Sequence, residues 1–114
     1  MADVFWIKTH DLRPPVTATL VDANLNPVDL SGASGVRFMM RLIRGSTLIV
    51  DENADIVDAT AGEVLYDWQE GDTDEAGGYW GEFEVLWDGT IPETFPSPTY
   101  VRIAIVDDLD VEGS

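Results

Sequence analysis

Apolar and polar residues alternate in short runs along most of the chain, and Gly, Pro, Asn and Asp interrupt these runs. No stretch of convincing length has helical periodicity, so the pattern is typical of an all-β sandwich or barrel. We expect seven to eight antiparallel strands. They cover residues 4–8, 16–22, 36–44, 47–50, 56–59, 63–68, 79–87 and 100–106, with a loop at 51–55 (DENAD) and a tight hairpin turn at 60–62 (TAG).

Successive residues of a strand point to opposite faces, which separates a core side from an outer side. The expected core positions are Val36, Phe38, Met40 and Leu42, then Val64, Tyr66 and Trp68, and finally Tyr79, Gly81, Phe83, Val85 and Trp87. Tyr79 follows the segment DEAG, which predicts a tyrosine corner whose hydroxyl bonds to a backbone group of the preceding loop. At Gly81, where an antibody domain would carry its cysteine, we expect Phe38 or Trp68 to fill the space.

The chain has 114 residues, which predicts one domain, with a core at 4–106 and an acidic tail at 107–114. It contains no cysteine, so a disulfide, a thiol nucleophile and a zinc site with Cys ligands are excluded. There is no apolar run of the length of a signal peptide or a membrane span. We therefore expect a soluble protein without a secretion signal of its own.

The formal net charge is −16, from 6 basic and 22 acidic residues. Such a surface repels nucleic acid and anionic membranes, so neither is an expected partner. The charge is also uneven, because 18 of the 22 acids lie after residue 50. Docking on a basic or polar shell and general solvation are both consistent with this asymmetry.

Candidate chemistry along the chain is sparse. Asp51, Asn53 and Asp55 alternate as in a calcium loop, but Ile56 and Gly62 stand where the EF-hand requires Gly and Glu. His10 is the only histidine, so it offers neither a catalytic triad nor a histidine metal site. With so many carboxylates, some pair always falls within glycosidase distance, and that signal is uninformative. We expect no catalytic, cofactor or metal residues, no cofactor and no small-molecule substrate.

Three segments match a known module: NPVDLSGA (26–33), YDWQEGDTDEAGGYWGEFEV (66–85) and DGT…ETFP (88–96). Over residues 14–106 the chain resembles the N-terminal domain of phage baseplate upper proteins, an immunoglobulin-like module of tailed-phage virions. The resemblance implies an immunoglobulin-like β-sandwich without a disulfide. It also implies a virion protein, assembled in the host cytoplasm, present in multiple copies and bound to other phage virion proteins. Baseplate, tail, neck and capsid-surface decoration all remain open as its location.

One sheet face is a candidate protein interface. If strands 36–44 and 79–87 are neighbours, the face combines Arg, Met and aromatic residues, a composition typical of interfaces. Its expected residues are Arg37, Met39, Arg41, Ile43, Trp80, Glu82, Leu86, Tyr100 and Arg102. Cross-strand ion pairs with Glu82 and Glu84, cover by a loop, or scattered exposed apolar residues would explain the same pattern.

The function expected from these observations is a non-enzymatic structural protein of a tailed-phage virion that binds other subunits through this face. A carbohydrate-binding or host-adhesion module is the alternative, with Trp80 or Trp87 as the platform for a sugar. A hydrolase would require a cleft with perturbed carboxylates.

Overall fold

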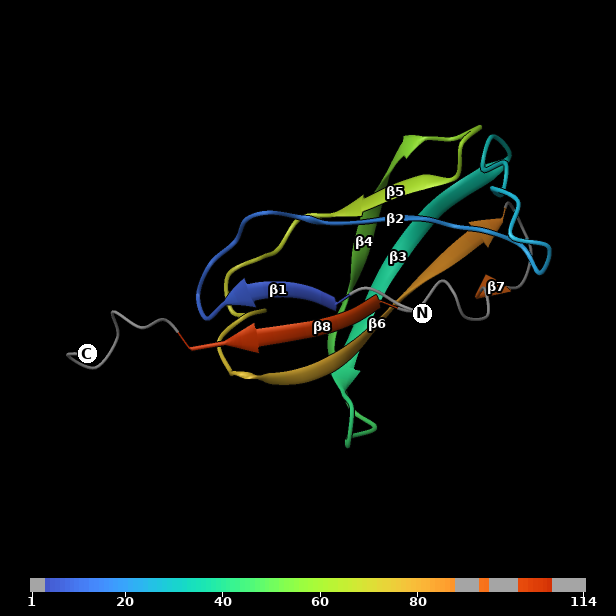
Figure 1. The fold of residues 1–114 in the computed structure, drawn as a ribbon. Helices are drawn as coiled ribbons and strands as arrows, with labels where there is room; N and C mark the ends of the chain where they lie inside the picture. Colours follow the sequence, from blue (N-terminus) through green and yellow to red (C-terminus); the bar gives the residue numbers. More distant parts are fainter. Residues whose placement is uncertain (1–3, 88–92, 95–100, 108–114) are drawn as a thin grey trace.

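The computed structural model describes residues 4–87, 93–94 and 101–107, and this part of the chain contains eight β-strands and no helix (Figure 1). The strands are β1 (Val4–Lys8), β2 (Val16–Thr19), β3 (Ala33–Leu42), β4 (Leu48–Asp58), β5 (Glu63–Tyr66), β6 (Gly77–Trp87), β7 (Glu93–Thr94) and β8 (Val101–Val106). The all-β prediction is confirmed. In the described segments no helix is long and apolar enough to span a membrane.

Seven strands form one continuous path in the order β1-β8-β6-β3-β4-β5-β2, and the short β7 pairs with β6. All pairs are antiparallel except β1 and β8, which run parallel and lie side by side in Figure 1. The expectation of a fully antiparallel fold is therefore wrong at this edge. The first and last strands are far apart in sequence, so no short connection forces them to be antiparallel.

The sheet curls over on itself. Phe38 of β3 stacks on Tyr66 of β5 at 4.8 Å between ring centroids, although β4 separates these two strands in the sheet. Phe38 also packs on Phe83 of β6 at 5.0 Å. The curled sheet therefore encloses an aromatic core. Its two halves, β1-β8-β6-β3 and β5-β2, both supply residues to this core.

Strand β4 joins these halves and replaces the loop expected at 51–55, which is a correction. Its first part pairs with β3 and its second part with β5. Val50 is its only buried residue, and most of its polar side chains are exposed. The acidic residues at 51–55 do not alternate with apolar residues, so the sequence pattern did not predict a strand there.

The remaining core follows the predicted parity closely. The buried apolar residues include Val36, Phe38, Met40, Val64, Tyr66, Trp68, Tyr79, Phe83 and Val85, as expected. Leu42, at the end of β3, is 38% exposed instead of buried. Trp87 is only partly buried. Both exceptions lie at strand ends, where the core stops.

The loop before β6 is fixed by two tyrosines. The Tyr79 hydroxyl donates a hydrogen bond to the Glu75 carbonyl oxygen at 2.8 Å, which confirms the tyrosine corner. The Tyr66 hydroxyl donates to Asp72 Oδ2 at 2.5 Å, and the same oxygen accepts from the Gln69 amide. The carboxylate of Asp72 therefore has a structural role in this loop.

Candidate functional site

The pairing of β3 with β6 places the predicted interface residues in rows. Arg37 lies opposite Glu84, Met39 opposite Glu82, and Arg41 opposite Trp80. On the other side of β6, Trp80 lies opposite Arg102 of β8. These side chains share the sheet side away from the core, and we call this side the outer face. It comprises Arg37, Met39, Arg41, Trp80, Glu82, Glu84, Leu86 and Arg102.

The structure brings most of the predicted set together. Ile43 follows directly after β3, and its amide donates to the Gly78 carbonyl oxygen at 3.1 Å, so it borders the outer face. Leu86 lies near the far end of β6, away from the Trp80 row. Tyr100 lies outside the described residues. The predicted parity therefore holds for the interface residues that the structure describes.

Arg37 is the centre of an ion-pair network on the outer face. Its Nη1 contacts Glu84 Oε1 at 2.8 Å, and its Nη2 contacts Asp51 Oδ1. The hydrogen bond to Asp51 is the main cause that raises the pKa of Arg37, and Glu84 adds to it. Asp51, the first residue of the pattern that fails the calcium-loop template, is thus paired with an arginine.

Arg41 does not pair with Glu82, contrary to the simplest cross-strand expectation. Its Nη1 donates to the carbonyl oxygens of Gly45 at 2.7 Å and Leu42 at 3.2 Å. Leu42 is the last residue of β3, and Gly45 lies in the turn that follows it. The guanidinium therefore stabilises this turn, and its main contacts are with backbone.

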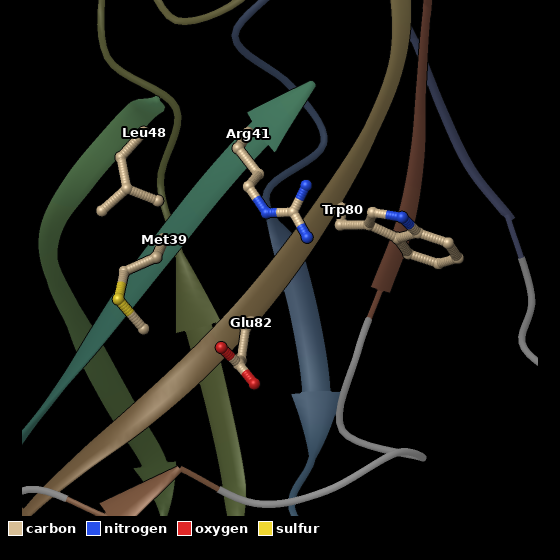
Figure 2. Close-up of a pocket in the computed structure, with 5 residues that line it drawn as sticks. All are labelled: Met39, Arg41, Leu48, Trp80 and Glu82. Carbon is tan, nitrogen blue, oxygen red and sulfur yellow. The ribbon is translucent and has the colours of Figure 1, made fainter. Parts of the chain in front are cut away.

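A hollow of about 340 Å³ opens on the outer face (Figure 2). Among the described residues its walls are Met39, Arg41, Leu48, Trp80 and Glu82, and we call it the Glu82 hollow. Figure 2 shows that β3, β4 and β6 all contribute to it. Leu48 was missed in the sequence interpretation, because a bulge in the pairing between Met40 and Arg41 brings it opposite Arg41.

Glu82 is a partly buried carboxylate in this hollow. Burial is the main cause that raises its pKa, and repulsion by Glu84 acts in the same direction. Arg41 opposes these effects only in part, since the net direction remains upward. The negative charge of Glu82 is therefore destabilised in the free protein.

A second hollow, of about 480 Å³, lies where the end of β3 meets the start of β6. Its described lining is Leu42, Ile43, Arg44, Gly78 and Arg102. The Arg102 guanidinium carbon lies 5.8 Å from the centroid of the Trp80 ring, within range of a cation–π interaction. A Cβ atom on Gly78 would lie 3.2 Å from Ile43 Cδ1 and 3.5 Å from Arg102 Nη2, so glycine leaves room for both side chains.

The described residues offer little for catalysis or metal binding. Within 4–87, 93–94 and 101–107 no group of three His, Asp or Glu side chains could hold a metal ion. Among the described residues, the lining of the Glu82 hollow contains one carboxylate, whereas glycosidases use a pair. The His10 side chain is 70% exposed and lies 3.6 Å from Asp74.

No family model matches the chain, and no curated protein matches it. Among solved structures, the fold is similar to the N-terminal domain of phage TP901-1 ORF48, with a TM-score of 0.67 and 15% sequence identity. The alignment covers 92% of this chain and 86% of that one. The likeness therefore concerns the fold of nearly the whole chain.

Proposed function

We propose that this protein is a non-enzymatic structural component of a tailed-phage virion, and that it binds other virion proteins through the outer face. The observation that carries the proposal is the similarity in fold to a phage protein domain over 92% of the chain. The three sequence segments that resemble a virion module support it independently.

We also propose that the fold is immunoglobulin-like. In immunoglobulin domains, strands G, F and C are neighbours in one sheet, and strands E and B in the other. The neighbours β8-β6-β3 and β5-β2 have the same chain order if β2, β3, β5, β6 and β8 are B, C, E, F and G. The tyrosine corner at Tyr79 lies at the start of β6, where strand F has it.

The composition of the outer face supports its role as an interface. It combines Trp80, Met39 and three arginines with two hollows on a chain of net charge −16. Interfaces are enriched in aromatic residues, Met and Arg relative to the remaining surface. Arg37 already pairs with Asp51 and Glu84 within the chain. We therefore assign the contact with a partner to the Glu82 hollow.

A carbohydrate-binding module remains the second candidate, and one observation favours it. Trp6 on β1 is 64% exposed, whereas Trp80 and Trp87 are partly buried. If the chain binds glycans, Trp6 is thus the better platform than the two tryptophans suggested by sequence. A glycan array with the wild-type protein and Trp6→Ala distinguishes this candidate, because only a glycan-binding module loses a signal on substitution.

Mass spectrometry of purified virions, separated into heads and tails, tests the main proposal. The protein should copurify with one of the two fractions at a fixed stoichiometry. Its absence from both fractions, while it is abundant in infected cells, would refute a structural role in the virion.

A further inference from the structure

Three carboxylates on or next to the outer face, those of Asp51, Glu82 and Glu84, differ in their ion pairs. Glu84 and Asp51 both bond to Arg37. Glu82 has no hydrogen bond or ion pair with any residue in the part of the chain that the structure describes. Glu82 is therefore the carboxylate of this face that still lacks a cation.

The two arginines near Glu82 make their main contacts with other groups. Arg41 bonds to the carbonyl oxygens of Gly45 and Leu42, and Arg102 lies over the Trp80 ring. Burial and the repulsion by Glu84 outweigh the attraction by Arg41, since together they raise the pKa of Glu82. An additional positive charge beside Glu82 would relieve this cost.

The walls of the Glu82 hollow suit a long cationic side chain. Met39, Leu48 and Trp80 present apolar surface, against which the methylene stem of Lys or Arg packs well. The face of a tryptophan ring attracts a lysine or arginine cation, as Arg102 near Trp80 illustrates. The volume of about 340 Å³ accommodates one such side chain.

We propose that the Glu82 hollow receives one lysine or arginine side chain of a partner protein, with the Glu82 carboxylate as the counter-charge and Trp80 and Met39 packed against the stem. The existence of the partner rests on the proposed function. A basic partner also complements a chain with a net charge of −16. A partner that presents an apolar side chain would bury the Glu82 charge further without a counter-ion, at a cost.

The probes for the test are Nα-acetyl-arginine amide and Nα-acetyl-lysine amide, with Nα-acetyl-citrulline amide as the neutral control. Each is titrated into the ¹⁵N-labelled protein at constant ionic strength, and amide and indole resonances are followed by NMR. The two cationic probes should cause saturable shifts at Met39, Trp80 and Glu82. Citrulline amide should bind these positions more weakly.

The variant Glu82→Gln keeps the shape of the side chain and removes its charge. It should weaken the binding of arginine amide by about three- to tenfold, the range expected for one partly buried ion pair. Glu63→Gln is the matched control, because Glu63 is exposed on β5 and lies outside the outer face. It should leave the affinity unchanged.

The proposal is overturned if citrulline amide binds as well as arginine amide, if Glu82→Gln leaves the affinity unchanged, or if no saturable shift occurs at the outer face. These readouts do not depend on virion assembly. A failure here is therefore distinguishable from a failure of the proposed function, which the copurification of the protein with virions decides.

Discussion

A Cβ atom on Gly81 of β6 would lie 2.8 Å from the Phe38 ring on the neighbouring strand β3. It would also lie 2.9 Å from Ile103 Cδ1. Phe38 thus occupies the space that an ordinary side chain at position 81 would need. This confirms the expectation that a large core residue fills the place of the missing side chain.

Gly81→Ala should therefore destabilise the protein by about 1–3 kcal/mol, the usual cost of overpacking a core. The free energy of unfolding in urea measures this cost. Gly32→Ala is the control, since a Cβ there has no atom within 4 Å, and its effect should stay within about 0.5 kcal/mol. The double variant Gly81→Ala/Phe38→Leu should lose less stability than the sum of the losses of the two single variants, because the smaller leucine leaves room for the Cβ atom. Wild-type stability of Gly81→Ala would contradict the packing described.

The two buried tyrosines predict a loss of stability at alkaline pH. Burial is the main cause that raises the pKa of Tyr66 and Tyr79 above 10.0, and Asp72 and Glu75 respectively add to it. Since the folded state holds both phenols neutral, their contribution is complete below pH 10 and decreases as the pH rises above it. The free energy of unfolding should therefore be lower at pH 11 than at pH 8.

Tyr66→Phe tests this assignment. At pH 8 the variant should lose about 1–3 kcal/mol, because the hydrogen bond to the Asp72 carboxylate disappears. Its stability should also fall less than that of the wild type between pH 8 and pH 11. Parallel pH curves for the two proteins would show that Tyr66 does not cause the alkaline loss.

Local patterns in the sequence were sufficient to predict much of the fold. Strand parity identified Phe38, Tyr66 and Phe83 as core, and the DEAG segment before Tyr79 identified the tyrosine corner. The same parity placed Trp80 and Glu82 on the outer face. These features depend on residues close together in the chain or on the alternation within one strand.

Features that depend on distant contacts were not predictable in the same way. The 51–55 segment is a strand because β3 and β5 pair with β4, and Arg37 compensates the charge of Asp51. Arg41 bonds to turn carbonyls whose position follows from the β3–β4 pairing and its bulge. No periodicity in the sequence encodes a bulge or the register between strands.

The charge of −16 predicts how salt affects docking on a partner. If docking is steered electrostatically, its on-rate should fall between 0.01 M and physiological salt, because the Debye length shrinks from about 30 Å to about 8 Å. Surface plasmon resonance with the virion partner measures this rate. An on-rate indifferent to salt, together with unchanged docking after Ala or Ser replacements at 107–112, would leave solvation as the explanation of the acidity.

We propose that the outer face joins this protein to other virion proteins, and the variant Trp80→Ala tests this proposal. Trp80 lines the Glu82 hollow on the side away from the core, so the free variant should remain folded by circular dichroism. Val57→Ala is the control, since Val57 is 58% exposed on β4 and lies outside the outer face.

The decisive measurement is the amount of each variant in purified particles, determined by quantitative mass spectrometry after complementation of a phage that lacks the gene. The incorporation of Trp80→Ala should fall at least about tenfold, as for loss of an interface anchor, while Val57→Ala should be incorporated like the wild type. Incorporation of folded Trp80→Ala at the wild-type level would show that the outer face does not bind other virion proteins.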